Sequence, residues 1–240
     1  MSALLAIDGV SKRFRGLVAV DRVACEVAQG EIFAVIGPNG AGKTTLFNMI
    51  AGALRPDEGA IAYRGERIDG LRPDEICRRG IARTFQIVRP FPALSVEDNV
   101  MVGALLRTPD VARATEQTHE VMRRLDLFDK RARVAKSLTL PDRKRLEVAR
   151  ALATAPQLLL LDEVMAGLRP TETDRVVAIL REINAQGMTI LLIEHVMRAV
   201  MALAGRVLVL HHGAQIALGT PQAVTREPAV VESYLGAEAL

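Results

Sequence analysis

The sequence has no tryptophan, only two tyrosines and six phenylalanines, and no apolar run long enough to span a membrane. So few aromatic rings argue against a stacking platform for single-stranded nucleic acid. The net charge of +3 does not require a nucleic-acid partner either. The two cysteines, Cys25 and Cys77, lack metal-ligand spacing and resemble ordinary core residues of a reducing compartment.

The start of the chain has no basic segment before its short apolar run, so we expect no signal peptide. Half of the 240 residues are hydrophobic and a quarter are charged. A chain of this length and composition can bury one substantial core, and the first expectation is a single α/β domain.

One stretch, residues 37–45, carries the strongest chemical signal. It reads Gly-Pro-Asn-Gly-Ala-Gly-Lys-Thr-Thr and satisfies the pattern G-x-x-x-x-G-K-[ST]. The apolar run 32–36 before it predicts a buried strand, and residues 44–53 after it predict a helix. Glycines are needed because a chain wrapped around a phosphate must point successive N–H groups inward. We expect Lys43 to reach the β- and γ-phosphates and the Thr44 hydroxyl to sit on Mg²⁺.

A second signal ends another apolar run. Four leucines, residues 158–161, predict a buried strand that runs into Asp162 and Glu163. Such a strand places Asp162 where it can hold Mg²⁺ through water and Glu163 where it can polarise an attacking water. Alone, a solvated loop would explain the pair equally well. The phosphate-binding loop makes it half of a nucleotide site.

The rest of the chain alternates strands with helices. Residues 4–27 predict two strands around a turn, and the strands expected over 189–193 and 206–210 belong with 32–36 and 158–161 in a mostly parallel sheet. Ligands of such sheets bind at the carboxyl ends of the strands. From about residue 96 to 136 apolar residues recur at helical spacing, which predicts a separate helical lobe.

With these motifs in order, the chain resembles an ATP-binding cassette (ABC) ATPase, the nucleotide-binding subunit of an ABC transporter. The resemblance runs from about residue 4 to 218. It implies a P-loop NTPase fold with a mostly parallel core sheet, an N-terminal antiparallel β subdomain and a helical lobe. We expect one domain over 1–240, with its core in 1–86 and 155–218, the lobe in about 87–154 and a tail in 219–240.

The resemblance also assigns roles to individual residues. Phe14 falls where the family stacks an aromatic ring on adenine, Gln86 on the glutamine that senses Mg²⁺ and the attacking water, and His195 on the switch histidine that contacts the γ-phosphate. His211 and His212 lack such a context and suggest a solvated turn. The expected catalytic residues are Glu163, His195, Gln86 and Lys43. The expected ligands of Mg²⁺ are Thr44, Gln86 and Asp162. The residues expected to bind ATP are Phe14, Gly37, Pro38, Asn39, Gly40, Ala41, Gly42, Lys43, Thr44 and Thr45.

Where the family carries its Leu-Ser-Gly-Gly-Gln signature, residues 138–142 read Leu-Thr-Leu-Pro-Asp. Pro141 has no N–H to offer a γ-phosphate, and we expect Asp142 to bring a negative charge toward one. In this family the signature faces the nucleotide of a second subunit, so the altered segment suggests a heterodimer with two unequal sites. A tolerated variant with ordinary geometry, in a homodimer or a heterodimer, is the alternative.

Several stretches, among them 85–91 and 145–150, resemble one branch, the bacterial branched-chain amino acid importers. This implies two membrane permease subunits, a second ABC ATPase subunit, a periplasmic solute-binding protein and a place on the cytoplasmic face of the inner membrane. The permeases would dock near residues 86–91, with Arg83 and Arg89 flanking apolar residues. An ATPase of a lipopolysaccharide or lipid exporter and a soluble non-transport ABC ATPase are the alternatives.

Overall fold

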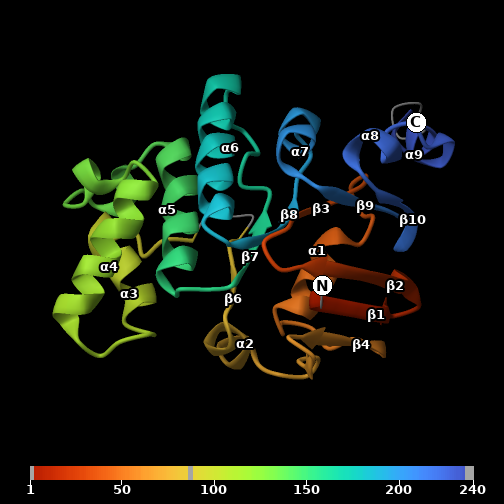
Figure 1. The fold of residues 1–240 in the computed structure, drawn as a ribbon, viewed down its shortest axis with the longest axis horizontal. Helices are drawn as coiled ribbons and strands as arrows, with labels where there is room; N and C mark the ends of the chain where they lie inside the picture. Colours follow the sequence, from red (N-terminus) through yellow and green to blue (C-terminus); the bar gives the residue numbers. More distant parts are fainter. Residues whose placement is uncertain (1–2, 86–88, 236–240) are drawn as a thin grey trace.

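The computed structural model describes residues 3–85 and 89–235 (Figure 1). A ten-stranded sheet runs through it in the order β5-β4-β1-β2-β10-β9-β3-β8-β7-β6. The strands are β1 (Ala3–Phe14), β2 (Leu17–Ala28), β3 (Ile32–Ile36), β4 (Glu58–Tyr63), β5 (Glu66–Arg67), β6 (Ile81–Arg83), β7 (Leu158–Asp162), β8 (Thr189–Ile193), β9 (Arg206–His211) and β10 (Ala214–Gly219).

The half of the sheet formed by β9, β3, β8, β7 and β6 is parallel. Every residue of β3, β7 and β8 is buried, because helices cover both faces of this half. Successive side chains of a strand enter opposite cores. Ile32 and Ile36 pack into the core that also contains buried residues of the helices between residues 96 and 185. Phe33 packs on the other side, with α1 (Lys43–Ile50). The parallel half therefore holds the carboxyl ends of β3, β7 and β8 in fixed register.

The other half of the sheet is antiparallel and comes from the N-terminal part of the chain. β1 pairs with β2 and β4, and β4 pairs with β5. β10 joins the two halves, antiparallel to β9 and parallel to β2 at a single pair, Ala214 with Asp21. These strands form the lower right of Figure 1. The expected mixed fold, with a parallel core and an N-terminal antiparallel part, is confirmed.

Residues 96–153, all of which the structure describes, contain helices and only one isolated bridge, between Ser95 and Val134. Their helices lie together at one end of the molecule, at the left of Figure 1. We call them the helical lobe. They are α3 (Val96–Ala104), α4 (Val111–Arg124), the 3-10 turns Phe128–Lys130 and Ala135–Ser137, and α5 (Leu140–Ala153).

The remaining helices cover the sheet or follow it. They are α2 (Pro73–Arg79), α6 (Pro170–Ala185), α7 (Met197–Leu203), α8 (Pro221–Val224) and α9 (Pro228–Leu235). Gly80 ends α2 in the left-handed conformation at φ 103°, as its position after Arg79 predicts. Within the described ranges, no helix combines the length and the hydropathy needed to cross a bilayer.

Candidate nucleotide site

The phosphate-binding loop connects the carboxyl end of β3 to the first turn of α1. The Lys43 ammonium group folds back over the loop and donates hydrogen bonds to the carbonyl oxygens of Gly37 at 2.7 Å and Pro38 at 2.8 Å. Burial lowers the pKa of Lys43, and the carboxylates of Glu163 and Asp162 oppose that shift. Gly42 is the N-cap residue of α1 and has no side chain that could bond to the first backbone N–H groups of the helix. These N–H groups therefore face the loop.

Two glycines of this loop have no room for a side chain. At Gly37, φ is +149° and a Cβ atom would lie 2.1 Å from the carbonyl oxygen of Leu210. At Gly42, φ is +101° and a Cβ atom would lie 2.3 Å from the carbonyl oxygen of Ala19. The loop is thus pressed against β2 and the end of β9, which explains why glycine is required here.

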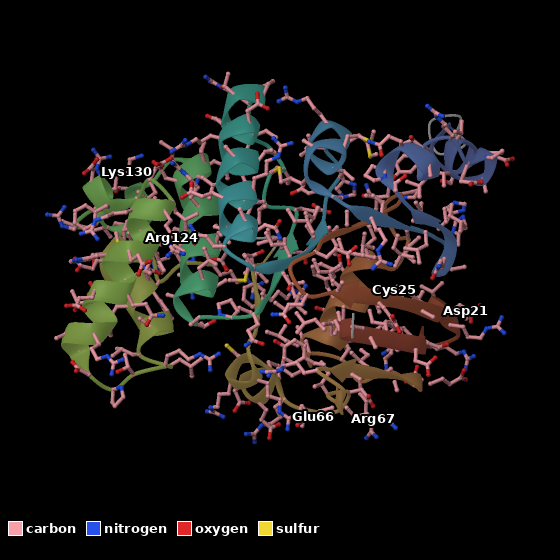
Figure 2. All side chains as sticks on the ribbon, in the orientation of Figure 1. Asp21, Cys25, Glu66, Arg67, Arg124 and Lys130 are labelled. Atoms are coloured by element: carbon pink, nitrogen blue, oxygen red, sulfur yellow. The ribbon has the colours of Figure 1, made fainter. Side chains whose placement is uncertain are left out.

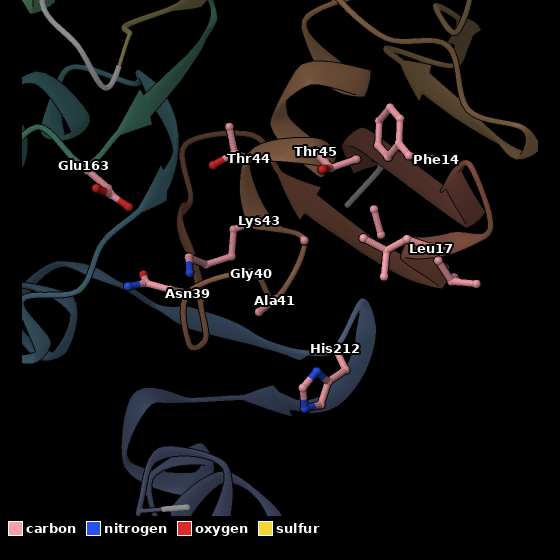
Figure 3. Close-up of a pocket in the computed structure, with 13 residues that line it drawn as sticks. Phe14, Leu17, Asn39, Gly40, Ala41, Lys43, Thr44, Thr45, Glu163 and His212 are labelled. Atoms are coloured by element: carbon pink, nitrogen blue, oxygen red, sulfur yellow. The ribbon is translucent and has the colours of Figure 1, made fainter. Parts of the chain in front are cut away.

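A cleft of about 510 Å³ opens over the loop (Figure 3). One wall is formed by Phe14, which is 41% exposed, and by Leu17 and Val18 from the start of β2. His212, in the turn between β9 and β10, lies across the cleft from them. The sequence predicts Phe14 but not Leu17, Val18 or His212. Leu17 and Val18 follow Phe14 in the β1–β2 hairpin, whereas the pairing of β10 with β2 brings His212 to the cleft. The expected loop residues that line it are Asn39, Gly40, Ala41, Gly42, Lys43, Thr44 and Thr45.

Glu163 and His195 come from the ends of neighbouring parallel strands, β7 and β8. His195 Nε2 lies 2.5 Å from Glu163 Oε1, within hydrogen-bond distance. Glu163 also lines the cleft above Lys43, whereas His195 meets the site through Glu163. The structure therefore brings together the two residues that the sequence placed 32 positions apart.

Asp162 is 1% exposed at the end of β7. Its Oδ2 atom accepts a hydrogen bond from Arg83 at 2.8 Å, and its backbone N–H donates to the Thr84 hydroxyl at 3.1 Å. Within the described part of the chain, Asp162 Oδ1 has no hydrogen-bond partner. A buried carboxylate oxygen with a free lone pair fits an Mg²⁺ ion or its bound water.

The described residues hold no cluster of three or more histidine, cysteine or acidic side chains that could bind a metal by themselves. Mg²⁺ at a nucleotide is commonly held by one or two carboxylates together with phosphate oxygens and waters, so Thr44 and Asp162 are an adequate protein contribution. Gln86, the other expected ligand, lies outside the described residues, and its roles stay predictions.

The sequence suggests that Arg83 flanks a docking surface. It lines the second hollow described below, but its side chain is only 11% exposed and its guanidinium group is bonded inward. Besides Asp162, it donates to the side-chain oxygen of Asn48 on α1 at 2.5 Å. Arg83 thus connects the strand that leads to residue 86 with the carboxylate at the end of β7.

The expectation for Asp142 is wrong. Its side chain does not extend outward toward a phosphate: it is buried, 2.6 Å from Lys130 Nζ and 2.5 Å from Arg145 Nη2. The Thr139 hydroxyl donates to the same carboxylate at 2.9 Å. The sequence pattern predicts a helix over residues 143–154, but α5 begins at Leu140, and this earlier first turn carries Asp142 inward. Lys130 belongs to the helical lobe (Figure 2). The negative charge of Asp142 is therefore compensated within the chain.

A second hollow, of about 290 Å³, lies between the helical lobe and the core. Phe85, 51% exposed, and Arg150 stand at its edge, and Glu147 is buried in its wall. Arg150 donates to the carbonyl oxygen of Arg89 at 2.7 Å and lies 5.0 Å from the centre of the Phe91 ring. Burial raises the pKa of Glu147, although the neighbouring Arg150 lowers it. We call this hollow the lobe groove.

A phosphate-binding loop after a central parallel strand, with an acidic pair on a nearby strand of the same sheet, defines the class of P-loop nucleoside triphosphatases. Within this class, the chain matches one particular family. A family model described as ABC transporter matches residues 20–166. The chain belongs to the ABC transporter ATPase family, and it is an ATP hydrolase of that type.

Relatives and solved structures agree with this assignment. The high-affinity branched-chain amino acid transport ATP-binding protein LivG of Salmonella typhimurium is 41% identical over 97% of this chain and 98% of its own length. BraF of Pseudomonas aeruginosa, of the same description, is 37% identical over the same shares. The lipopolysaccharide export system ATP-binding protein LptB of Acidithiobacillus ferridurans is 35% identical over 98% of both. An ABC transporter cassette in its ADP conformation superposes with a TM-score of 0.90 at 30% identity, covering 98% of this chain and 100% of that one.

Proposed function

We propose that this chain is the ATP-hydrolysing subunit of a bacterial importer for branched-chain amino acids or related small polar solutes. The observation that carries this is the full-length similarity to LivG and BraF, at 41% and 37% identity. The similarity to a lipopolysaccharide exporter subunit covers as much of the chain but is lower, at 35%. Two permease subunits, a second ATPase subunit and, indirectly, a periplasmic binding protein complete the proposed assembly at the cytoplasmic face of the inner membrane.

In the proposed site, the adenine ring packs on Phe14 and the phosphates lie in the loop of residues 37–45. Lys43 exchanges its two carbonyl contacts for the β- and γ-phosphates. Thr44 and Asp162, with Gln86 by analogy to the family, would hold Mg²⁺. When bound, this ion offsets charge on the phosphate oxygens.

Glu163 polarises the attacking water, and His195 orients the Glu163 carboxylate through their 2.5 Å contact while facing the γ-phosphate. ATP binding closes the pair of ATPase subunits, and hydrolysis reopens it. The lobe groove, with Phe85 at its edge and the Phe91 ring beside Arg150, is the surface on which a permease helix would dock.

Glu163→Gln tests the assignment of the water-activating residue. The variant should bind ATP with magnesium as the unmodified protein does and lose turnover by about 100-fold or more, because general-base catalysis is removed. Lys43→Ala should lose nucleotide binding instead. Turnover by Glu163→Gln at the normal rate would remove Glu163 from this role.

The substrate class needs a different test. The chain, assembled with its cognate permease and ATPase subunits in vesicles, should hydrolyse ATP faster when the cognate binding protein loaded with leucine, isoleucine or valine is added. Stimulation by a different amino acid or amide would place the substrate among the related solutes. Stimulation by lipopolysaccharide alone would favour the exporter.

We further propose that the two ATP sites of the assembly are unequal. The Thr139 hydroxyl donates to Asp142, and Pro141 lacks an N–H, so this signature segment offers a partner's γ-phosphate few donors. The competent site would combine this chain's phosphate-binding loop with an intact signature from the other subunit. Glu163→Gln in this chain should then stop turnover, while the matching change in the other subunit should leave most of it. Equal losses would contradict the proposal.

A further inference from the structure

Glu194 is a buried carboxylate that the proposed mechanism does not use. It follows β8 directly, precedes His195 and is 1% exposed. Its Oε1 atom accepts a hydrogen bond from the backbone N–H of Met165 at 2.9 Å. In the described ranges its Oε2 atom has no hydrogen-bond partner. Burying a carboxyl group with one unpaired oxygen costs free energy, so its presence at this position calls for a functional explanation.

That contact holds a strained segment in place. Glu163 has a φ of +51°, in the left-handed region that residues with a side chain avoid. Such a conformation costs about 1–3 kcal/mol and persists only where surrounding contacts impose it. Here the Glu163 N–H donates to the Ile193 carbonyl at 3.0 Å, and the Glu163 carbonyl accepts from Lys144 Nζ at 2.9 Å. The Met165 contact to Glu194 fixes the chain two residues further on.

Together these main-chain contacts determine where the Glu163 side chain lies. The contacts with Ile193 and Glu194 tie the segment 163–165 to the end of β8, the strand that precedes His195, and the contact with Lys144 ties it to α5. The Glu163 carboxylate can lie 2.5 Å from His195 and line the nucleotide cleft only while the main chain keeps this path. The charged groups around Glu194 are Lys144 and Glu163, and burial raises its pKa to about 7. A neutral carboxyl group keeps an oxygen that can accept the Met165 N–H, although an ionised one accepts a stronger hydrogen bond.

We propose that Glu194 is a positioning residue for ATP hydrolysis: by accepting the Met165 N–H, it holds residues 163–165 in the path that aims Glu163 at the nucleotide. The inference rests on the role proposed above for Glu163. It assigns to Glu194 a geometric task, separate from nucleotide binding, which the loop of residues 37–45 carries out.

Three variants separate geometry from charge. Glu194→Gln keeps the length and an acceptor oxygen but not the charge. Glu194→Asp keeps the charge but withdraws the acceptor by one methylene group. Glu194→Leu removes the acceptor at similar volume. Turnover is measured in the assembled transporter and ATP affinity by nucleotide titration.

We expect Glu194→Asp and Glu194→Leu to lower kcat by about 10–100-fold, because misplacement of a catalytic group costs this much. Glu194→Gln should keep kcat within about threefold, because it keeps the acceptor oxygen. The ATP affinity of all three variants should stay within about twofold of the unmodified protein, because Glu194 does not contact the nucleotide. Should the Leu variant fail to fold, the Asp variant alone must show the loss of kcat.

Three results would overturn the inference: an Asp variant more active than the Gln variant, unchanged kcat in both Asp and Leu, or parallel losses of kcat and ATP affinity. Failure of the proposed function is seen separately, as normal turnover by Glu163→Gln. If that variant is inactive while Glu194→Asp and Glu194→Leu are normal, only the positioning role is wrong.

Discussion

At the scale of single residues, the phosphate-binding loop gives a matched pair of glycines. A Cβ atom at Gly42 would overlap the carbonyl oxygen of Ala19, whereas one at Gly40 would meet nothing within 4 Å. Both have positive φ, so both substitutions are strained by about 1–2 kcal/mol. Only the first also forces the loop away from β2.

We therefore expect Gly42→Ala to weaken ATP binding by about 100-fold or more, and Gly40→Ala by about tenfold or less, each 1.4 kcal/mol counting tenfold. Fluorescent-nucleotide titration measures both. Equal affinities in the two variants would show that the loop shifts freely and that its contact with β2 is unimportant.

Cys25 offers a test of burial. Burial raises the pKa of its thiol from 9.0 to about 12, with Glu31 and Glu26 adding to the shift and Arg206 opposing it. The reactive thiolate is thus scarce at pH 8, and we expect alkylation slower by about 1,000-fold than for a thiol of ordinary pKa. Mass spectrometry after iodoacetamide treatment should find Cys77, which is partly exposed, modified first. Preferential labelling of Cys25 would contradict its buried place in β2.

At the scale of elements, the first turn of α5 depends on the buried carboxylate of Asp142. Burial alone would raise its pKa, but hydrogen bonds from Lys130 and Thr139 outweigh that effect and lower the pKa below 3.8. A depressed pKa means that this stabilisation is present above the unfolded-state value and is lost as the pH falls through the folded-state value.

Asp142→Ala should therefore lower the free energy of unfolding at pH 7 by about 2–4 kcal/mol, because it leaves Lys130 and Arg145 without their shared partner. Glu120→Ala, which breaks the exposed pair with Arg124 on α4, is the control and should cost about 0.5 kcal/mol or less. Urea unfolding of both variants provides the comparison. A loss at Asp142 no larger than the control would mean that the network contributes little.

Elements with strong local signals could be predicted from the sequence. β3, β7 and β8 are short, wholly apolar runs, and α2 has proline at its start and glycine at its end. α7 could not be predicted: it has seven residues and follows Val196, which provides no side-chain cap. The sequence pattern predicts a strand over residues 81–86, but β6 ends at Arg83.

The candidate site divides in the same way. The loop of residues 37–45 and the pairs at 162–163 and 194–195 have local signatures, or a resemblance, that a single sequence reveals. The contacts of Arg83 with Asp162, of Asp142 with Lys130 and of Glu194 with Met165 do not. They depend on how distant elements pack, and no local pattern records that packing.

At the scale of the whole molecule, the lobe groove is the contact through which a conformational change of this chain would be coupled to a membrane subunit. Phe85→Ala removes the exposed ring at its rim. We expect transport by the assembled complex to fall by about tenfold, as loss of an aromatic anchor commonly costs 1–2 kcal/mol or more. ATP affinity of the chain should not change.

Val111 is a suitable control for this experiment. It is 65% exposed, it lies at the start of α4, and it does not line the groove. Val111→Ala should leave transport and ATP hydrolysis as they are. If Phe85→Ala behaves in the same way, the groove is not the contact through which transport is driven.

The side chain of Arg83 has one more implication. Its guanidinium group holds the acid at the tip of β7 and the amide of Asn48 on α1, and it also lies 5.9 Å from the centre of the exposed Phe85 ring. A permease that displaces this ring need not send a signal through the fold. Arg83 alone would connect the displaced ring to Asp162, the carboxylate proposed to bind Mg²⁺.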